Sequence, residues 1–299
     1  MAAVFSKPLA KCFPDSIISQ LFPPPSTFDP LRDIPDLTGK VAIVTGGAVG
    51  IGYHTVLALL QKNAKVYIAT RSETKTGREA IFVHLDLADL ASVRRAVREL
   101  ANKEEKLDIY STTHQLTAQG YDLHFGTNVL GHYYFTSLLK PLLKRSTQLN
   151  GEKARVVFTS SNAFEYAPGK GAGWKIYGIS KFANVLTANI FQRDHADEFS
   201  SYSVHPGGIQ SELTRHSNSF EQLLAKAIMK PTPMGALTQL YAGTMPEAGN
   251  VPGGYFILWA RLAEQQPRFK NEELQKKFKE WVDTELRAFA ESSEGSWNA

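Results

Sequence analysis

The 299-residue sequence predicts an α/β fold in which a parallel β-sheet lies between two layers of helices. From Lys40 onward, short apolar runs alternate with amphipathic stretches, as in chains whose parallel strands are joined by helices. A glycine-rich turn follows the first apolar run, and hydrophobic residues make up 43% of the chain, enough for a full core. We therefore expect a single three-layer α/β/α domain over residues 37–299, preceded by a proline-rich arm at 1–36.

The apolar runs and their spacing predict the elements in chain order. The β-branched run at 41–44 is the first strand, and the spacing of 53–62 predicts the helix behind the glycine turn. Further strands are expected at 65–70, 81–85, 107–110, 154–159, 201–205 and 253–258. Further helices are expected at 88–103, 121–144, 174–193, 221–229, 233–244 and 271–290.

Composition excludes several classes of function. The balance of 33 Lys and Arg against 29 Asp and Glu gives a net charge of +4 without basic clusters, so we expect no nucleic-acid partner. Cys12 is the single cysteine and the eight histidines lack metal-binding spacing, so we expect no bound metal. No window reaches the ~18 consecutive apolar residues of a membrane span. Residues 1–25 also lack the apolar stretch of a signal peptide.

We therefore expect a reducing, cytoplasmic location. The arm is interpreted as a loose segment that packs on the domain. The alternative is a short amphipathic helix at 14–22 that touches a membrane surface.

The glycine-rich turn contains Gly46, Gly50 and Gly52, between the first strand and a helix. Glycine permits φ > 0 and a close approach of the backbone to a ligand. The helix that begins near Gly50 offers free N–H groups and the positive end of its dipole to a pyrophosphate. A strand, a glycine turn and a helix in this order predict a dinucleotide site rather than an ordinary connection.

The end of the second strand indicates which dinucleotide binds. In this topology that edge meets the adenosine ribose, where a carboxylate would repel a 2′-phosphate. Arg71 stands there instead, with forked donors that suit a phosphate, and Lys75 adds positive charge. We therefore expect NADP. Asp86, after the third strand, is interpreted as an acceptor for the adenine amino group or, alternatively, as the cap of the next helix.

A tyrosine and a lysine stand four residues apart in the helix expected at 174–193. Side chains at i and i+4 share one helix face, so Tyr177 and Lys181 point the same way. A tyrosine with its ordinary pKa of ~10 is a poor acid–base group at neutral pH. A nearby ammonium stabilises the phenolate and lowers that pKa. Tyr177 is therefore the candidate acid–base group for a carbonyl or an alcohol, although this spacing also occurs by chance in helices.

Two more polar residues complete the candidate site. Ser161 follows the fifth strand, at the edge where loops gather over the ligand of a parallel sheet, and its hydroxyl is a candidate partner of the substrate oxygen. Ser160 is the competing choice. Asn128 lies early in the helix expected at 121–144 and is a candidate to hold a water that links Lys181 to solvent. The alternatives are a turn residue for the serine and a buried polar contact for Asn128.

Taken in order, these motifs resemble the short-chain dehydrogenase/reductase family. The matching pieces are Thr45-Gly46-x3-Gly50-Ile51-Gly52, Asp86-Leu87, Thr127-Asn128-Val129-Leu130-Gly131-His132, Ser160-Ser161, Tyr177-x3-Lys181 and His205-Pro206-Gly207-Gly208-Ile209-Gln210-Ser211. The resemblance covers residues 36–262, most of the chain. Leu123-His124-Phe125-Gly126-Thr127-Asn128 and Gly254-Tyr255-Phe256 resemble the fungal branch close to retinol dehydrogenases.

The resemblance implies a Rossmann-type doubly wound sheet and hydride transfer between a nicotinamide cofactor and a substrate carbon. It implies a catalytic tetrad in which Tyr177 is the acid–base group, Lys181 holds the nicotinamide ribose, Ser161 orients the carbonyl, and Asn128 is the fourth member. Family members commonly form homo-oligomers. The residues expected to bind NADP are Gly46, Gly50, Ile51, Gly52, Arg71, Lys75, Asp86, Asn128, Tyr177, Lys181, Pro206, Ile209 and Ser211.

Three stretches depart from the family pattern. After the fourth strand the sequence continues as Ser111-Thr112-Thr113-His114 where the family has Asn-Asn-Ala-Gly. Only residues 71–80 lie between the second and third strands, although a parallel crossover usually takes a dozen or more residues and a helix. The segment from Ser161 to Tyr177 is also short. Either coding segments were lost from the sequence, or the chain is a diverged member with weakened cofactor affinity.

The sequence therefore predicts an NADP-dependent oxidoreductase that acts on a carbonyl or secondary alcohol of a small or medium apolar substrate, in secondary metabolism. The alternative is a catalytically impaired nucleotide-binding protein, and a nucleotide-sugar epimerase is disfavoured by the glycine spacing. A lid is expected at 212–234, where the apolar contacts are Leu213, Phe220, Leu223 and Leu224.

Overall fold

The computed structural model describes residue 20 and residues 23–71, 79–111, 122–162, 172–210 and 229–292. Its centre is one eight-stranded sheet with the strand order β3-β2-β1-β4-β5-β6-β7-β8. Seven strands are parallel, and β8 pairs with β7 in the antiparallel sense. The doubly wound parallel sheet predicted from the sequence is confirmed.

The strands of the described chain agree closely with the predicted apolar runs. Their bounds are β1 Val41–Thr45, β2 Lys65–Thr70, β3 Ile81–His84, β4 Ile109–Ser111, β5 Ala154–Thr159, β6 Phe199–Val204, β7 Tyr255–Ile257 and β8 Arg261–Ala263. Every residue of β1 and β6 is buried, and so is every residue of β5 except Arg155. This explains their mostly apolar or small-residue character, because helices cover both faces of such strands.

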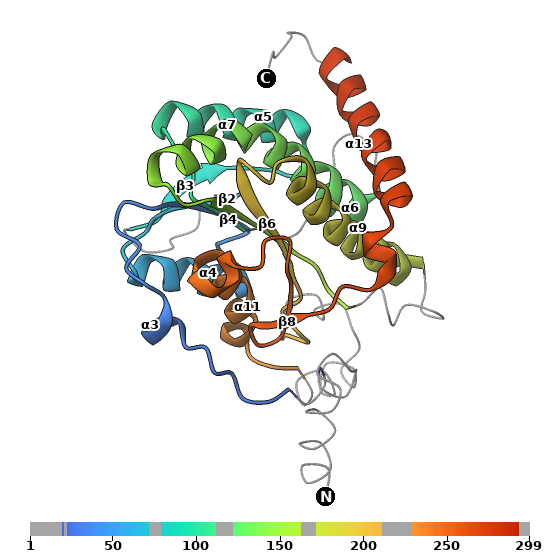
Figure 1. The fold of residues 1–299 in the computed structure, drawn as a ribbon. Coiled ribbons are helices and arrows are strands. Elements are labelled where there is room, and N and C mark those ends of the chain that lie inside the picture. The colour runs from blue at the N-terminus through green and yellow to red at the C-terminus, as the bar shows by residue number, and fades with distance from the viewer. Residues whose placement is uncertain are drawn as a thin grey trace, which may run out of the picture.

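Helices lie on both faces of the sheet (Figure 1). On one face of the sheet, α5, α7 and α9 form a core to which α13 also contributes. On the other face, α4 and α11 pack together with Phe28 and Ile34 from the chain before β1. The longer helices are α4 Gly50–Gln61, α5 Leu90–Lys103, α7 His132–Asn150, α9 Ala172–Asp194, α11 Thr232–Thr244 and α13 Glu272–Ser292. Short helical segments are α3 Pro30–Asp33, α6 Leu123–Phe125, η1 Gly126–Gly131, α12 Pro246–Gly249 and η3 Pro267–Lys270.

The structure corrects two expectations about the elements. The single helix predicted at 121–144 consists of α6, a π-helical segment η1 and α7, which continues to Asn150. The strand β8 was not predicted, because Arg261 and Ala263 are only partly buried, Leu262 is exposed, and the three residues have no apolar periodicity. The helix predicted at 221–229 lies almost wholly outside the described residues.

The short connection between β2 and β3 does not prevent parallel pairing. Tyr67 aligns with Ile81 and Thr70 with His84, so residues 71–80 join two neighbouring parallel strands. Residues 72–78 of this connection, 112–121 after β4 and 163–171 after β5 lie outside the described chain.

Candidate active site

The candidate site lies at the carboxyl ends of the parallel strands. From β1, the next two strands in the chain, β2 and β3, extend the sheet toward one edge. The strand β4 then pairs with the other side of β1, and β5 to β7 extend the sheet toward the opposite edge, so the order reverses between β1 and β4. In open parallel sheets, ligands commonly bind outside the carboxyl ends of the strands at such a switch point. The glycine turn follows β1. Ser161 follows β5, which pairs with β4, and Tyr177 lies in α9.

The glycine turn has the backbone geometry that its residues predict. Gly46 has a φ of 59° and Gly50 a φ of 57°, both in the left-handed region that favours glycine. A Cβ atom on Gly52 would overlap the Gly46 carbonyl, so the turn closes tightly on itself. No side chain caps the start of α4, which leaves its first N–H groups for a ligand. Open space around Gly50 and this uncapped helix fit a pyrophosphate.

The turn after β6 packs beside the glycine turn. A Cβ atom on Gly235 of α11 would come within 2.8 Å of the Ile51 side chain and 2.9 Å of the Ile209 side chain. Ile51 and Ile209, two predicted cofactor residues from distant segments, therefore both lie against Gly235. Pro206 is buried next to them in sequence, and Ser211 lies outside the described residues.

The residues predicted to bind the adenosine end are only partly described. Arg71 is exposed and directly follows β2. The end of β2 is tied to the glycine turn, because the Ala69 carbonyl accepts a hydrogen bond of 2.9 Å from the Gly46 N–H. Lys75 lies outside the described residues. The Asp86 carboxylate accepts from the Ala88 N–H at 2.9 Å, and Asp89 rather than Asp86 caps α5. The alternative that Asp86 is the helix cap is therefore wrong.

Tyr177 lies in the first half of α9, partly buried, with its hydroxyl hydrogen-bonded to Ser161. Burial raises the pKa of Tyr177 to about 12, although the bond from Ser161 works in the opposite direction. His124 of α6 contacts the Tyr177 ring edge to face, with centroids 5.7 Å apart. Sequence reasoning assigned His124 no role, because this contact depends on how α6 approaches α9.

Lys181 is buried, and its Nζ donates to the Thr159 carbonyl at 3.0 Å. The Nζ atom lies 5.8 Å from the centre of the Tyr177 ring, so the two side chains share one region, as the i and i+4 spacing predicts. Desolvation lowers the pKa of Lys181 to about 7. The predicted lowering of the Tyr177 pKa by this lysine is wrong for this structure, because burial dominates the ionisation of both groups.

Ser160 and Ser161 have separate surroundings. The buried Ser160 Oγ donates to the Lys181 carbonyl at 2.7 Å, and the Ser160 N–H donates to the Val204 carbonyl at 2.6 Å. Ser160 therefore ties α9 to the sheet, whereas Ser161 is only partly buried and bonds Tyr177.

Asn128 lies in the π-helical segment η1 rather than in regular α-helix. Its Nδ2 donates to the Ser180 Oγ at 2.9 Å, and its side chain is buried. The buried polar contact considered as an alternative for Asn128 is therefore present. π-Helical insertions are rare and are frequent at functional sites, which makes this segment notable next to Tyr177.

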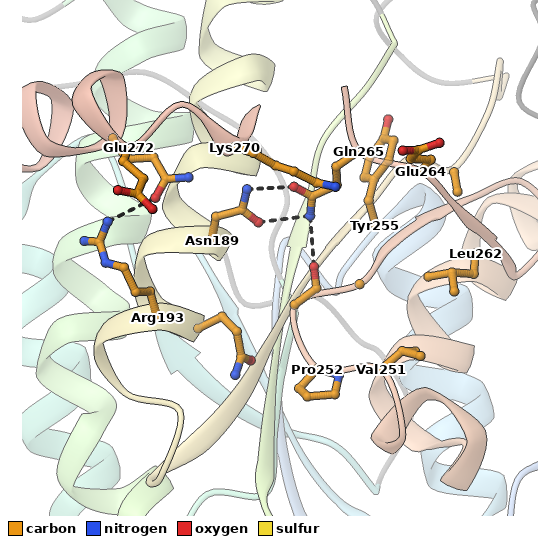
Figure 2. Close-up of a pocket in the computed structure, with 15 residues that line it drawn as sticks. Asn189, Arg193, Val251, Pro252, Tyr255, Leu262, Glu264, Gln265, Lys270 and Glu272 are labelled. Atoms are coloured by element: carbon orange, nitrogen blue, oxygen red, sulfur yellow. Dashed lines mark hydrogen bonds between the residues drawn. The ribbon is translucent and has the colours of Figure 1, made fainter. Parts of the chain in front are cut away.

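A pocket of about 480 Å³ lies elsewhere on the molecule, between the second half of α9, the β7–β8 hairpin and the start of α13. Figure 2 shows Asn189, Gln265 and Tyr255 among its lining residues, with two hydrogen bonds joining the Asn189 and Gln265 amides. None of the predicted site residues lines this pocket.

Among the described residues, no group of three or more His, Cys, Asp or Glu side chains is arranged to hold a metal ion. In the same part of the chain, no helix combines the length and the apolar character needed to span a membrane.

Comparisons with known proteins agree with this geometry. A family model described as short chain dehydrogenase matches residues 40–222. A short-chain dehydrogenase/reductase of Armillaria gallica is 43% identical, over 92% of this chain and 98% of that protein. Retinol dehydrogenase 11 of Mus musculus is 33% identical, over 74% of this chain and 78% of that protein. The structure of a Pseudomonas aeruginosa RhlG/NADP active-site complex matches with a TM-score of 0.63 and 26% identity, over 77% of this chain and 97% of that chain.

Proposed function

The chain belongs to the short-chain dehydrogenase/reductase family, and from this premise we propose that it is an NADP-dependent reductase of a carbonyl group. Oxidoreductase chemistry follows from the family. The choice of NADP and the carbonyl substrate are our proposal. The observation that carries it is the grouping of Ser161, Tyr177 and Lys181 at the end of the sheet where the glycine turn follows β1.

Tyr177 is proposed to give the proton. A pKa of about 12 keeps its phenol protonated at neutral pH, which is the form that can protonate a forming alkoxide. The hydrogen bond from Ser161 favours the phenolate, and therefore assists the release of the proton. Ser161 is also placed to donate to the substrate oxygen, which would orient the carbonyl between the two hydroxyls.

The remaining site residues are proposed to bind and position. When bound, the nicotinamide cofactor supplies the hydride. Lys181 offers a buried amino group to the cofactor ribose, and Asn128 braces the start of α9 through Ser180. The glycine turn and the start of α4 would hold the pyrophosphate, with Ile51, Pro206 and Ile209 along the nicotinamide side.

The proposed preference for NADP rests on Arg71. Its guanidinium is exposed at the end of β2, where the topology brings the adenosine ribose, and no carboxylate stands at that position. The Pseudomonas aeruginosa RhlG neighbour was solved as a complex with NADP, which supports the same choice. We keep the roles proposed for Lys75 and Ser211 in binding the cofactor, and for residues 212–234 as the lid. Of these residues, the structure describes only 229–234.

The substrate is proposed to be apolar and of small or medium size. The apolar residues of the expected lid and the resemblance to retinol dehydrogenase 11 support this class. A role in secondary metabolism is part of the same proposal.

A panel of apolar ketones and aldehydes, assayed with NADPH, tests the proposal together with Tyr177→Phe. We expect the wild-type chain to reduce part of the panel, and the variant to lose about 10²- to 10⁴-fold in kcat because its ring has no proton to give. NADPH affinity should be unchanged in the variant, since its phenyl ring occupies the same space. Equal turnover by both proteins would exclude Tyr177 as the proton donor.

A further inference from the structure

Two neighbouring aromatic side chains of the short helix α6 contact two different helices. The His124 ring meets the Tyr177 ring of α9 edge to face, with centroids 5.7 Å apart and an angle of 76° between the planes. The Phe125 ring meets Trp281 of α13 in the same way, with centroids 5.4 Å apart and an angle of 69°. Edge-to-face ring pairs of this geometry attract each other and favour one relative orientation. We call Trp281, Phe125, His124 and Tyr177 the contact chain.

Hydrogen bonds at Asp122 fix the start of α6. The Asp122 carboxylate accepts from the His124 N–H at 3.0 Å and from the Phe125 N–H at 3.1 Å. The Asp122 carbonyl accepts from the Gly126 N–H at 2.7 Å. Such bonds satisfy the N–H groups that lack a partner within the helix at its start. The backbone that carries both aromatic rings is therefore held, although α6 has only three residues.

The segment η1, which continues from α6, holds the main chain of Tyr177. Asn128 donates from Nδ2 to the Ser180 Oγ at 2.9 Å, and the Ser180 Oγ donates to the Tyr177 carbonyl at 2.8 Å. On a fixed main chain, a tyrosine ring can still turn about its side-chain bonds. The contact with His124 therefore restricts the direction in which the Tyr177 hydroxyl points.

The helix α13 is docked on the domain along one face. It lies beside α6 and α9 (Figure 1). Residues at intervals of three or four share a helix face, and four such residues pack against the core on the side of α5, α7 and α9: Phe278, Val282, Leu286 and Phe289. Trp281 is 36% exposed, so it lies at the margin of this face and covers Phe125 instead of filling the core.

We propose that His124 and Trp281 are positioning residues, through which the C-terminal helix α13 sets the orientation of Tyr177. This inference rests on the proposed function, in which the Tyr177 hydroxyl must point at the substrate oxygen. Proton transfer needs a heavy-atom distance of about 2.6–3.2 Å, so a small rotation of the ring slows it. His124 holds the ring, and Trp281 holds α6 through Phe125.

Trp281→Ala, with Phe289→Ala as its matched control, tests the role of α13. Each variant removes an aromatic side chain of α13, but Phe289 contacts Tyr134 of α7, with centroids 6.0 Å apart, instead of α6. Both should lower the Tm by a few degrees. Only Trp281→Ala should lower kcat, by about 10-fold, with the Kd of NADPH unchanged, because a misplaced proton donor slows the reaction without altering cofactor contacts. Equal kcat values for the two variants would overturn the proposal.

Two variants of His124 separate a ring contact from a chemical role of the imidazole. We expect His124→Ala to lower kcat by about 10-fold or more, because Tyr177 loses its ring partner. His124→Phe keeps an aromatic ring at this position and should have a kcat within about twofold of the wild type. If His124→Phe is as slow as His124→Ala, the imidazole itself is required and the positioning role is wrong.

Nitration of Tyr177 by tetranitromethane follows the ring without requiring turnover. The reagent modifies accessible phenols, and mass spectrometry of the peptide that contains Tyr177 gives the rate at this residue. We expect Trp281→Ala and His124→Ala to raise the rate several-fold over the wild type, and Phe289→Ala to leave it unchanged. Equal rates in all four proteins would contradict the contact chain. The proposed function fails separately, if the wild type shows no NADPH-dependent turnover while the nitration rates differ as expected.

Discussion

At the scale of single residues, burial controls the ionisation of the candidate site. Tyr177 and Lys181 lie on one helix face, yet desolvation raises the pKa of the phenol to about 12 and lowers that of the amine to about 7. Both shifts favour the neutral forms. The hydrogen bond from Ser161 acts in the opposite direction on Tyr177, so this serine has more influence on the proposed proton donor than its place in a loop indicates.

The two serines after β5 should give opposite results when replaced by alanine. Ser161→Ala removes the bond to Tyr177 and should lower kcat by about 10²-fold or more, with little change in Tm. Ser160→Ala removes a buried bond to the Lys181 carbonyl and should lower the Tm by a few degrees. Steady-state kinetics and thermal unfolding of both variants check this assignment. The reverse pattern would make Ser160 the catalytic serine.

Lys181 should make stability depend on pH between about 7 and 10.5. Burial lowers its pKa from 10.5 to about 7, so in this range the unfolded chain binds a proton that the folded chain does not. The free energy of unfolding therefore rises with pH, and this contribution is lost as the pH falls through 7.

Lys181→Met removes that dependence and keeps an apolar chain in the same space. We expect the variant to unfold at a higher temperature than the wild type near pH 7, and the difference to shrink as the pH rises toward 10.5. A difference that stays constant across this window, measured by thermal unfolding, would show that Lys181 is not desolvated.

At the scale of elements, two close backbone contacts position the site. Gly52 lies against the Gly46 carbonyl at the start of α4, and Gly131 of η1 lies against the Leu87 carbonyl. Neither position has room for a Cβ atom. The first contact closes the turn that we propose to hold the pyrophosphate, and the second fixes the π-helical segment that carries Asn128.

Gly52→Ala should therefore disturb both the fold and the cofactor site. The new methyl group would overlap the Gly46 carbonyl, so we expect a lower Tm and a loss of NADPH affinity. Gly243→Ala is the matched control, because a Cβ atom there would meet its nearest neighbours at 3.4 Å and 3.8 Å. Binding titrations and thermal unfolding compare the two. Unchanged NADPH binding by the Gly52 variant would remove the glycine turn from the cofactor site.

Sequence patterns predict those elements of this fold whose residues follow a continuous apolar run or a regular spacing. Buried strands such as β1 and β2 have continuous apolar runs, and the i and i+4 spacing places Tyr177 and Lys181 together. The strand β8 has no such pattern, because it forms only where the chain reverses after β7. The π-helical segment and the contact of His124 with Tyr177 depend on how α6 meets α9, which local sequence does not encode.

At the scale of the whole molecule, buried clusters cover both faces of the sheet in the described chain. The candidate site lies near the place where the strand order reverses, between β1 and β4. The chain before β1 contributes Phe28 and Ile34 to the core that the sheet forms with α4 and α11. The pocket between α9 and α13 is separate from the predicted site residues. The division at residue 36, the homo-oligomer and the cytoplasmic location remain predictions from the sequence.

The central claim is that this chain binds NADP at the glycine turn, with its nicotinamide end beside Tyr177 and Lys181. Titration of the purified protein with NADPH, with NADH as the control ligand, tests it most directly. We predict saturable binding of NADPH, weaker binding of NADH, and a selective loss of NADPH affinity in Arg71→Ala, because only NADPH carries the 2′-phosphate. A folded protein that binds neither nucleotide would contradict the account.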